Sequence, residues 1–180
     1  DSWYFDSPMD PTSQYETHIA TEVVAFIDGN YRTLATREKR AITGLSMGGH
    51  GALFLAIRHP QIFGAAGSMS GGVDIRDSSK KWHLRQKIGS IKEFPQRWDS
   101  LTVITNIEKF QDAHLALIID CGIKDMFLQM NREFHEKLLQ AEIPHDYIER
   151  PGDHNWKYWN NAVRYQLLFF YEFFQEIPED

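Results

Sequence analysis

The chain has 180 residues, of which 42% are hydrophobic and 13% aromatic, and this composition supports one domain with a sizeable core. Its formal net charge is −6 and no basic run is longer than Lys80-Lys81, which argues against a nucleic-acid surface or an anionic-membrane patch and favours small molecules or neutral polymers as partners. The single cysteine, Cys121, excludes an intrachain disulfide framework and a multi-cysteine zinc site.

The first segment, "DSWYFDSPMDPTSQYE", has the composition of a loop. It lacks the basic and apolar regions of a signal peptide and does not begin with Met, so we expect Asp1 to be the start of a processed, cleaved or truncated product. No stretch of the chain approaches the roughly 18 apolar residues of a membrane span. The sequence does not determine the cellular compartment: a secreted or periplasmic location is favoured, and a cytoplasmic location is the alternative.

Apolar residues at helical spacing predict a helix from Tyr15 to about Tyr31. The short β-rich run "AITGL" follows and ends at a glycine cluster, and "HGALFLAIRHP" then predicts a helix that ends at Pro60. The run "FGAAGSMSG" predicts a strand of small residues. The pattern is therefore helix, strand, sharp turn, helix and strand.

Residues 74–112 are irregular, and we expect them to form an excursion over one face of the sheet, with helical patches at 88–94 and 104–110. The run "HLALIID" predicts a strand buried on both faces. An amphipathic helix over 126–143, a strand over 144–150 and an aromatic helix over 156–174 complete the chain. This alternation predicts an α/β fold, with a mostly parallel sheet and helices on both faces.

Gly44, Ser46 and Gly48 form the pattern GxSxG between a predicted strand and a predicted helix. A nucleophilic serine at such a turn adopts an unfavourable backbone conformation, and the flanking glycines leave room for the chain to pass. The amide of Met47, at the start of the helix, could donate to an oxyanion next to the Ser46 hydroxyl. A plain tight turn is the alternative.

A serine needs a histidine base, and eight histidines compete for this role. We favour His154 because the loop "PGDHN" lies between the last strand and the last helix, at the carboxyl end of the sheet. His50, one helical turn after the serine, is interpreted as a packing or pocket-wall residue. The other histidines lie within helices, at element ends or in the irregular segment.

Three aspartates could orient this histidine. Asp125 is preferred because it lies in the loop beyond the buried strand. Asp120 ends that strand and could be structural, and Asp153 is adjacent to His154 in sequence, which points the two side chains apart. The chain order of serine, aspartate and histidine is the one expected of an α/β-hydrolase. Motifs for metal ligation or phosphate binding are absent, so we expect no metal and no cofactor.

Three segments together resemble one known family: "GLSMGGHGAL", "DCGIKDMFL" and "IPHDYIERPGDHNWKYW". They are similar to the serine esterases of the α/β-hydrolase fold that include tributyrin esterases, feruloyl and acetyl esterases, and S-formylglutathione hydrolases of the esterase D type. The resemblance implies Ser46 as nucleophile, Asp125 as acid and His154 as base, an acyl-enzyme intermediate, and no cofactor. Two aromatic positions could line the substrate pocket: Trp156, and Trp82 or Trp98 from the excursion.

The resemblance also implies a departure at the front of the chain. Members of the family carry several strands before the "YET" helix, and an HG-type loop there supplies a second oxyanion amide. We therefore expect residues 1–180 to be the C-terminal portion of a single α/β-hydrolase domain that lacks its N-terminal strands, with the excursion over the active site. The strand before Ser46 would keep an open edge, to be covered by a missing N-terminal portion or a partner chain, or by a second copy in a homo-oligomer.

The expected function is a serine carboxylesterase acting on short acyl or aryl esters, of acetyl or feruloyl type, on plant-polysaccharide fragments among others. The alternatives are an S-formylglutathione thioesterase, an acyltransferase, and an inactive fragment or binding module.

Overall fold

The computed structural model describes residues 2–176, and its centre is one sheet of four parallel strands. The strands follow one another in chain order across the sheet: β1 (Ala41–Leu45), β2 (Ala65–Met69), β3 (Ala116–Gly122) and β4 (Asp146–Arg150). All of β2 is buried, and its small side chains allow helices to approach from both faces. The predicted α/β class is confirmed.

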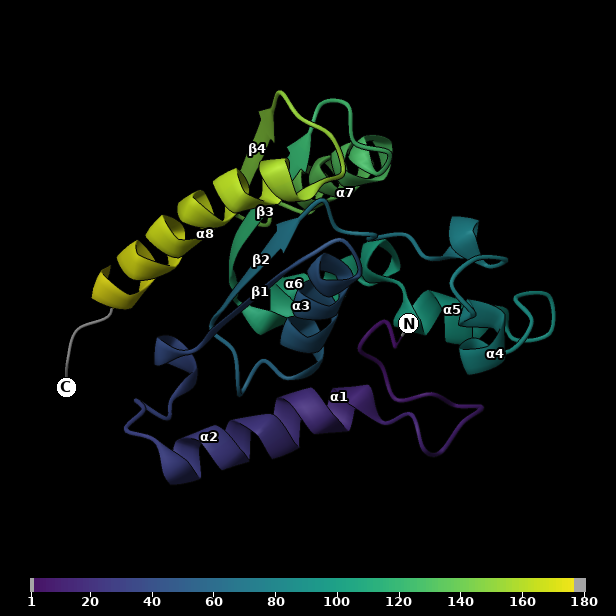
Figure 1. The fold of residues 1–180 in the computed structure, drawn as a ribbon, viewed down its shortest axis with the longest axis horizontal. Coiled ribbons are helices and arrows are strands. Elements are labelled where there is room, and N and C mark those ends of the chain that lie inside the picture. Colours follow the sequence, from purple (N-terminus) through teal and green to yellow (C-terminus); the bar gives the residue numbers. More distant parts are fainter. Residues whose placement is uncertain (1, 177–180) are drawn as a thin grey trace.

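Helices cover both faces of this sheet (Figure 1). Three of them share one face: α3 (Met47–Arg58), α6 (Ile107–Ala113) and α7 (Leu128–Gln140). The aromatic helix α8 (Trp156–Glu176) crosses the other face, where Met69, Tyr158 and Trp159 pack together. Within residues 2–176, none of the helices has the length and apolar character that a membrane crossing requires.

The first predicted helix is confirmed. It runs through α1 (Tyr15–Thr17), a π-helical stretch (His18–Val23) and α2 (Val24–Asn30). Short 3₁₀ turns lie at Arg37–Lys39, Arg76–Ser78 and Val103–Thr105.

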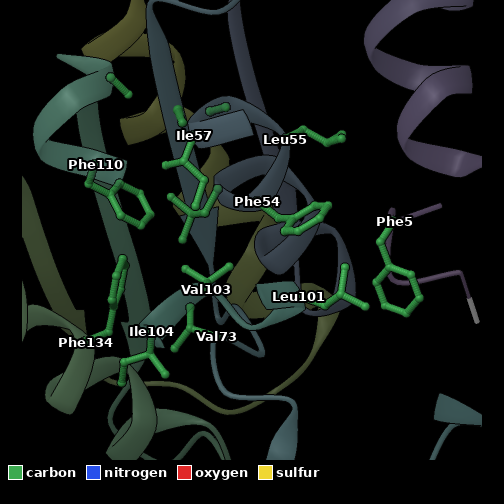
Figure 2. Close-up of a cluster of buried hydrophobic side chains, with 14 of the residues drawn as sticks. Phe5, Phe54, Leu55, Ile57, Val73, Leu101, Val103, Ile104, Phe110 and Phe134 are labelled. Atoms are coloured by element: carbon green, nitrogen blue, oxygen red, sulfur yellow. The ribbon is translucent and has the colours of Figure 1, made fainter. Parts of the chain in front are cut away.

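The main core lies between α3, the segment after β2, and α7 (Figure 2). Phe54 from α3 and Phe110 from α6 are each 1% exposed, and the Phe110 ring centroid lies 5.4 Å from that of Phe134 on α7. Phe5 is also 1% exposed, so the N-terminal segment belongs to this core although its composition predicts a loop.

The helices of the excursion differ in part from the prediction. Residues 89–94 separate α4 (Leu84–Ile88) from α5 (Pro95–Leu101), so the helix expected over 88–94 is wrong, whereas the one expected over 104–110 overlaps α6. Gly89 ends α4 with a φ of 96°, a left-handed conformation that glycine adopts without strain, and proline then begins the next helix. Trp98 on α5 is fully buried and donates to the Gly89 carbonyl at 3.2 Å. It is a core residue, and the suggestion that it lines the substrate pocket is wrong.

Strand β1 lies at one edge of the sheet, with β2 on one side and no strand of residues 2–176 on the other. A cavity of about 480 Å³ separates this edge from the helix α1–α2, lined by apolar residues such as Ile19 and Ile42. A second cavity of about 470 Å³ lies between β1 and α8, with Leu167 and Phe170 in its wall. Both sides of the edge are therefore apolar and hollow.

Candidate active site

Ser46 occupies the sharp turn between β1 and α3. Its φ of 55° and ψ of −118° are a strained conformation for a residue with a side chain. The turn is held by hydrogen bonds from the Ser46 amide to the Met69 carbonyl (2.8 Å) and from the Gly72 amide to the Ser46 carbonyl (3.2 Å). A Cβ on Gly44 would collide with the backbone of Gly48. The predicted tight strand-to-helix turn is present.

His154 reaches the serine from the loop between β4 and α8. Its Nε2 lies 2.9 Å from the Ser46 Oγ, and its Nδ1 lies 2.9 and 3.0 Å from the two carboxylate oxygens of Asp125. Two aromatic rings meet the imidazole edge-to-face, Phe127 at 5.1 Å and Trp159 at 4.8 Å between centroids. The imidazole is thereby held by hydrogen bonds at both nitrogens and by contacts with two aromatic rings.

Asp125 has a buried side chain in the loop after β3. Burial raises the pKa of its carboxyl, but hydrogen bonds outweigh that effect and the pKa lies below its ordinary value. The lowering contributions come from His154, from the Phe127 amide (2.8 Å) and from the Ser70 hydroxyl. The carboxyl is therefore ionised at neutral pH and can keep the Nδ1 proton of His154 in place.

The other two candidate aspartates lie elsewhere. Asp153 is exposed. Asp120, which is fully buried, forms an ion pair with Arg150 and accepts a hydrogen bond from Tyr158. Of the three aspartates that the sequence leaves open, Asp125 is the one whose carboxylate is hydrogen-bonded to His154 within the described residues.

The loops that carry the aspartate and the histidine are bonded to each other. The Ile123 amide donates to the Arg150 carbonyl and the Lys124 amide to the Gly152 carbonyl, both at 2.9 Å. A Cβ on Gly122 would lie 2.5 Å from the Gly152 oxygen, so the backbones touch at this point. The distance between Asp125 and His154 is thus fixed by backbone contacts as well as by the side chains.

A cavity of about 670 Å³ opens at Ser46 and continues along β1. Met47, the first residue of α3, lines it, and the amide of a first helical residue has no partner within its helix. Trp156 lies at the same cavity and is 66% exposed. Trp82 is not among the residues that line this cavity, and its ring contacts that of Phe127, with 6.0 Å between centroids.

The model of an esterase family, described as "Putative esterase", matches residues 2–170. The chain belongs to this esterase family. An esterase of Mycobacterium tuberculosis (strain H37Rv) is 29% identical over 84% of this chain and 39% of its own length. An acetyl esterase of Caldicellulosiruptor saccharolyticus is 24% identical over 90% of this chain and 65% of its length. This member of the family thus spans less than two thirds of either relative.

Solved structures of esterases and related hydrolases are similar to this chain in fold. A ferulic acid esterase is 30% identical, with a TM-score of 0.78 over 94% of this chain and 64% of that one. An S-formylglutathione hydrolase from Staphylococcus aureus, 22% identical, has a TM-score of 0.78 over 94% of this chain and 68% of its own. The esterase-family chain therefore has an α/β-hydrolase fold.

His50 of this family member is a packing residue, as its place in the sequence suggests. It is fully buried, its Nε2 lies 3.0 Å from the Leu101 carbonyl, and burial lowers its pKa to about 4. The sequence did not predict that the rings of Phe127 and Trp159 would contact His154. Trp159 follows Trp156 by three positions, so the helical period of α8 was the available signal. Residues 2–176 contain no cluster of three metal-ligating side chains.

Proposed function

We propose that this chain carries the catalytic residues of a serine carboxylesterase that hydrolyses short acyl or aryl esters through an acyl-enzyme. The observation that supports this most is the continuous hydrogen-bonded series from the Ser46 hydroxyl through His154 to Asp125. Nucleophile, base and orienting acid are the three roles that acyl transfer to a serine requires.

In the acylation step, the Ser46 Oγ attacks the ester carbonyl carbon while its proton passes to the His154 Nε2, 2.9 Å away. The carbonyl oxygen becomes an oxyanion, which the Met47 amide can stabilise. The Asp125 carboxylate accepts the hydrogen bond from the His154 Nδ1–H, so the proton stays on the ring, and its negative charge stabilises the imidazolium. Collapse of the tetrahedral intermediate breaks the bond to the alcohol, which leaves with the proton from Nε2, and Ser46 retains the acyl group.

In the deacylation step, a water molecule gives one proton to the His154 Nε2 as its oxygen attacks the acyl carbon. The second tetrahedral intermediate expels the Ser46 oxygen, which recovers that proton. The products are a carboxylic acid and free enzyme. This half-reaction needs no metal or organic cofactor, since every proton that moves is held by Ser46, His154 or water.

For the substrate, we propose acetyl or feruloyl esters, including those on plant-polysaccharide fragments. The support is that a relative is an acetyl esterase and a solved structure is a ferulic acid esterase. An S-formylglutathione thioesterase is the second candidate, because a structure of such a hydrolase shares the fold. An acyltransferase would use the same acyl-enzyme with an alcohol in place of water.

We also propose that further strands of a longer protein lie beside β1. The free edge of that strand is flanked by apolar cavities on both faces, and the chain spans 39% and 65% of two relatives. Intact-mass and size measurements of the active protein test this. Full activity in a monomer of these 180 residues would contradict it, and a dimer joined at β1 would replace the strands by a second copy.

The test of the catalytic role is labelling of the whole protein by a fluorophosphonate probe. We expect Ser46→Ala to abolish labelling and hydrolysis. The matched control is Ser100→Ala, because Ser100 is an exposed serine on α5. Absence of labelling in the folded wild-type protein would contradict the enzyme proposal and favour a binding module. Relative kcat/KM values for p-nitrophenyl acetate, methyl ferulate and S-formylglutathione then rank the substrate classes.

A further inference from the structure

The N-terminal segment places Tyr4 in the cavity that opens at Ser46. Ser2, Trp3 and Phe5 around it are buried, whereas Tyr4 is only half-buried. Trp3 contacts the His50 ring edge-to-face at 5.3 Å and the Trp82 ring at 5.4 Å. The buried neighbours therefore anchor the segment, and the tyrosine ring is the part that faces the cavity.

The backbone of this segment is strained at two consecutive residues. Trp3 has a φ of 52° and Tyr4 a φ of 63°, values that residues with side chains rarely adopt. Strain of this kind persists where surrounding packing enforces it, and it is concentrated at functional sites. Ser46, with its φ of 55°, is another such residue at the same cavity.

The Tyr4 ring lies along α3 and points toward the first residues of that helix. A Cβ on Gly51 would overlap the inner end of the ring, while a Cβ on Gly48 would lie 3.8 Å from the phenolic oxygen. From Gly51 to Gly48 the helix moves one turn closer to Ser46. The hydroxyl is thus directed to the end of α3 where the Met47 amide lies.

The hydroxyl is also unengaged. Among the described residues that line the cavity, the Thr43 hydroxyl is bonded to Gln166 and the Ser46 hydroxyl to His154. Trp156 lies at the exposed rim. No hydrogen bond joins the Tyr4 hydroxyl to another described residue, so it is available as a donor inside the cavity.

We propose that Tyr4 is a catalytic residue whose hydroxyl donates a hydrogen bond to the carbonyl oxygen of the ester bound at Ser46. The Tyr4 hydroxyl would act beside the Met47 amide, and its hydrogen bond to the carbonyl oxygen would become stronger as that oxygen becomes negatively charged. This deepens the proposed esterase function and rests on it. It also gives the described chain a side-chain donor where the family resemblance implies an amide from a preceding loop.

The test is Tyr4→Phe in the whole protein, with p-nitrophenyl acetate as substrate. The variant keeps the ring against Gly51, so we expect an unchanged melting temperature. Removal of one oxyanion donor costs about 10²- to 10³-fold in kcat. We expect a loss of about 10²-fold in kcat with KM nearly unchanged, and a similar weakening of inhibition by phenylboronic acid, whose tetrahedral adduct imitates the oxyanion.

Tyr15→Phe is the matched control, because Tyr15 is 44% exposed on α1. Fluorophosphonate labelling run to completion counts the competent sites, so that kcat refers to active enzyme only. A change in kcat of less than threefold in Tyr4→Phe, or an effect confined to KM, would overturn the proposal. Wild-type labelling and its loss in Ser46→Ala test the esterase function separately.

Gly51→Ala gives a second test that leaves the hydroxyl in the molecule. The added methyl group would displace the Tyr4 ring. If the position of the hydroxyl matters, kcat falls in this variant as well, and adding Tyr4→Phe to it causes little further loss. Independent, multiplying losses in the double variant would contradict the proposed role.

Discussion

Replacing Asp125 by Asn tests the orientation of His154 directly. The asparagine can keep the hydrogen bond from the Phe127 amide to Oδ1, which is 2.8 Å long. Its amide nitrogen then takes the place of Oδ2, 2.9 Å from the His154 Nδ1. Because that nitrogen is a donor, Nδ1 must become an acceptor and the ring proton moves to Nε2. The imidazole would then donate to the Ser46 hydroxyl and could not accept its proton.

The expected loss follows from this change of tautomer. In a Ser-His-Asp site such a substitution lowers kcat by about 10⁴-fold, equivalent to about 5 kcal/mol of transition-state stabilisation. The assay is steady-state hydrolysis of p-nitrophenyl acetate at neutral pH by the whole protein. Asp153→Asn is the matched control, because Asp153 is exposed and adjacent to the same histidine. We expect it to keep kcat within threefold.

Asp125→Asn activity above one tenth of wild type would refute the assignment of Asp125 as the acid. A loss of 10³-fold or more in Asp153→Asn or Asp120→Asn, with the fold intact, would move that role to another aspartate. Stability supplies a second readout. The pKa of Asp125 is lowered in the folded state, so its ionised form stabilises the fold above the unfolded pKa and this contribution is lost as pH falls. The stability difference between wild type and Asp125→Asn should therefore be larger at pH 7 than at pH 3.

Two further substitutions, Gly44→Ala and Arg150→Met, test the parts that support the site, and Gly29→Ala is the control for the first. Gly44→Ala would place a methyl group against the Gly48 backbone, so we expect lost fluorophosphonate labelling and a lower melting temperature. Gly29→Ala, with open space around its Cβ in α2, should be neutral or stabilise by up to about 1 kcal/mol. Arg150→Met would leave the buried Asp120 carboxylate without its cation, and urea unfolding should show a loss of about 3–5 kcal/mol. A smaller loss in the double variant Arg150→Met with Asp120→Asn would confirm that the unpaired charge is the cause.

The sequence predicted the sheet and the three residues at its carboxyl end because their signals are local. A β-rich run, a glycine cluster and a helical period around Ser46 determine a turn that a few residues can form. The loops of Asp125 and His154 follow runs that are strands in the structure, and parallel strands bring such loops to one edge. The preference for Asp125 rested on its place in the loop after β3, and the resulting chain order agreed with that of an α/β-hydrolase.

The excursion and the aromatic contacts could not be predicted in the same way. Its helices are short, α4 having five residues and α5 seven, so their limits depend on a glycine and a proline more than on hydrophobic period. Trp82 and Trp98 look alike in sequence, and tertiary packing alone separates a half-buried ring from a core one. The role of Tyr4 also depends on tertiary contacts, since its segment has the composition of a loop.

The arrangement of the site makes it depend on how α8 is docked. Ser46 follows β1 and His154 follows β4, and these strands are at opposite edges of the four-stranded sheet. The segment with His154 must therefore extend past the ends of β3 and β2 to reach Ser46. The first turn of α8 supplies this connection, because the Trp159 indole donates to the Ser70 hydroxyl at 3.2 Å just beyond β2 while its ring packs against His154. Contacts along α8 therefore contribute to the Ser46–His154 distance as well as to stability, and a loosened α8 should reduce kcat before it unfolds the sheet.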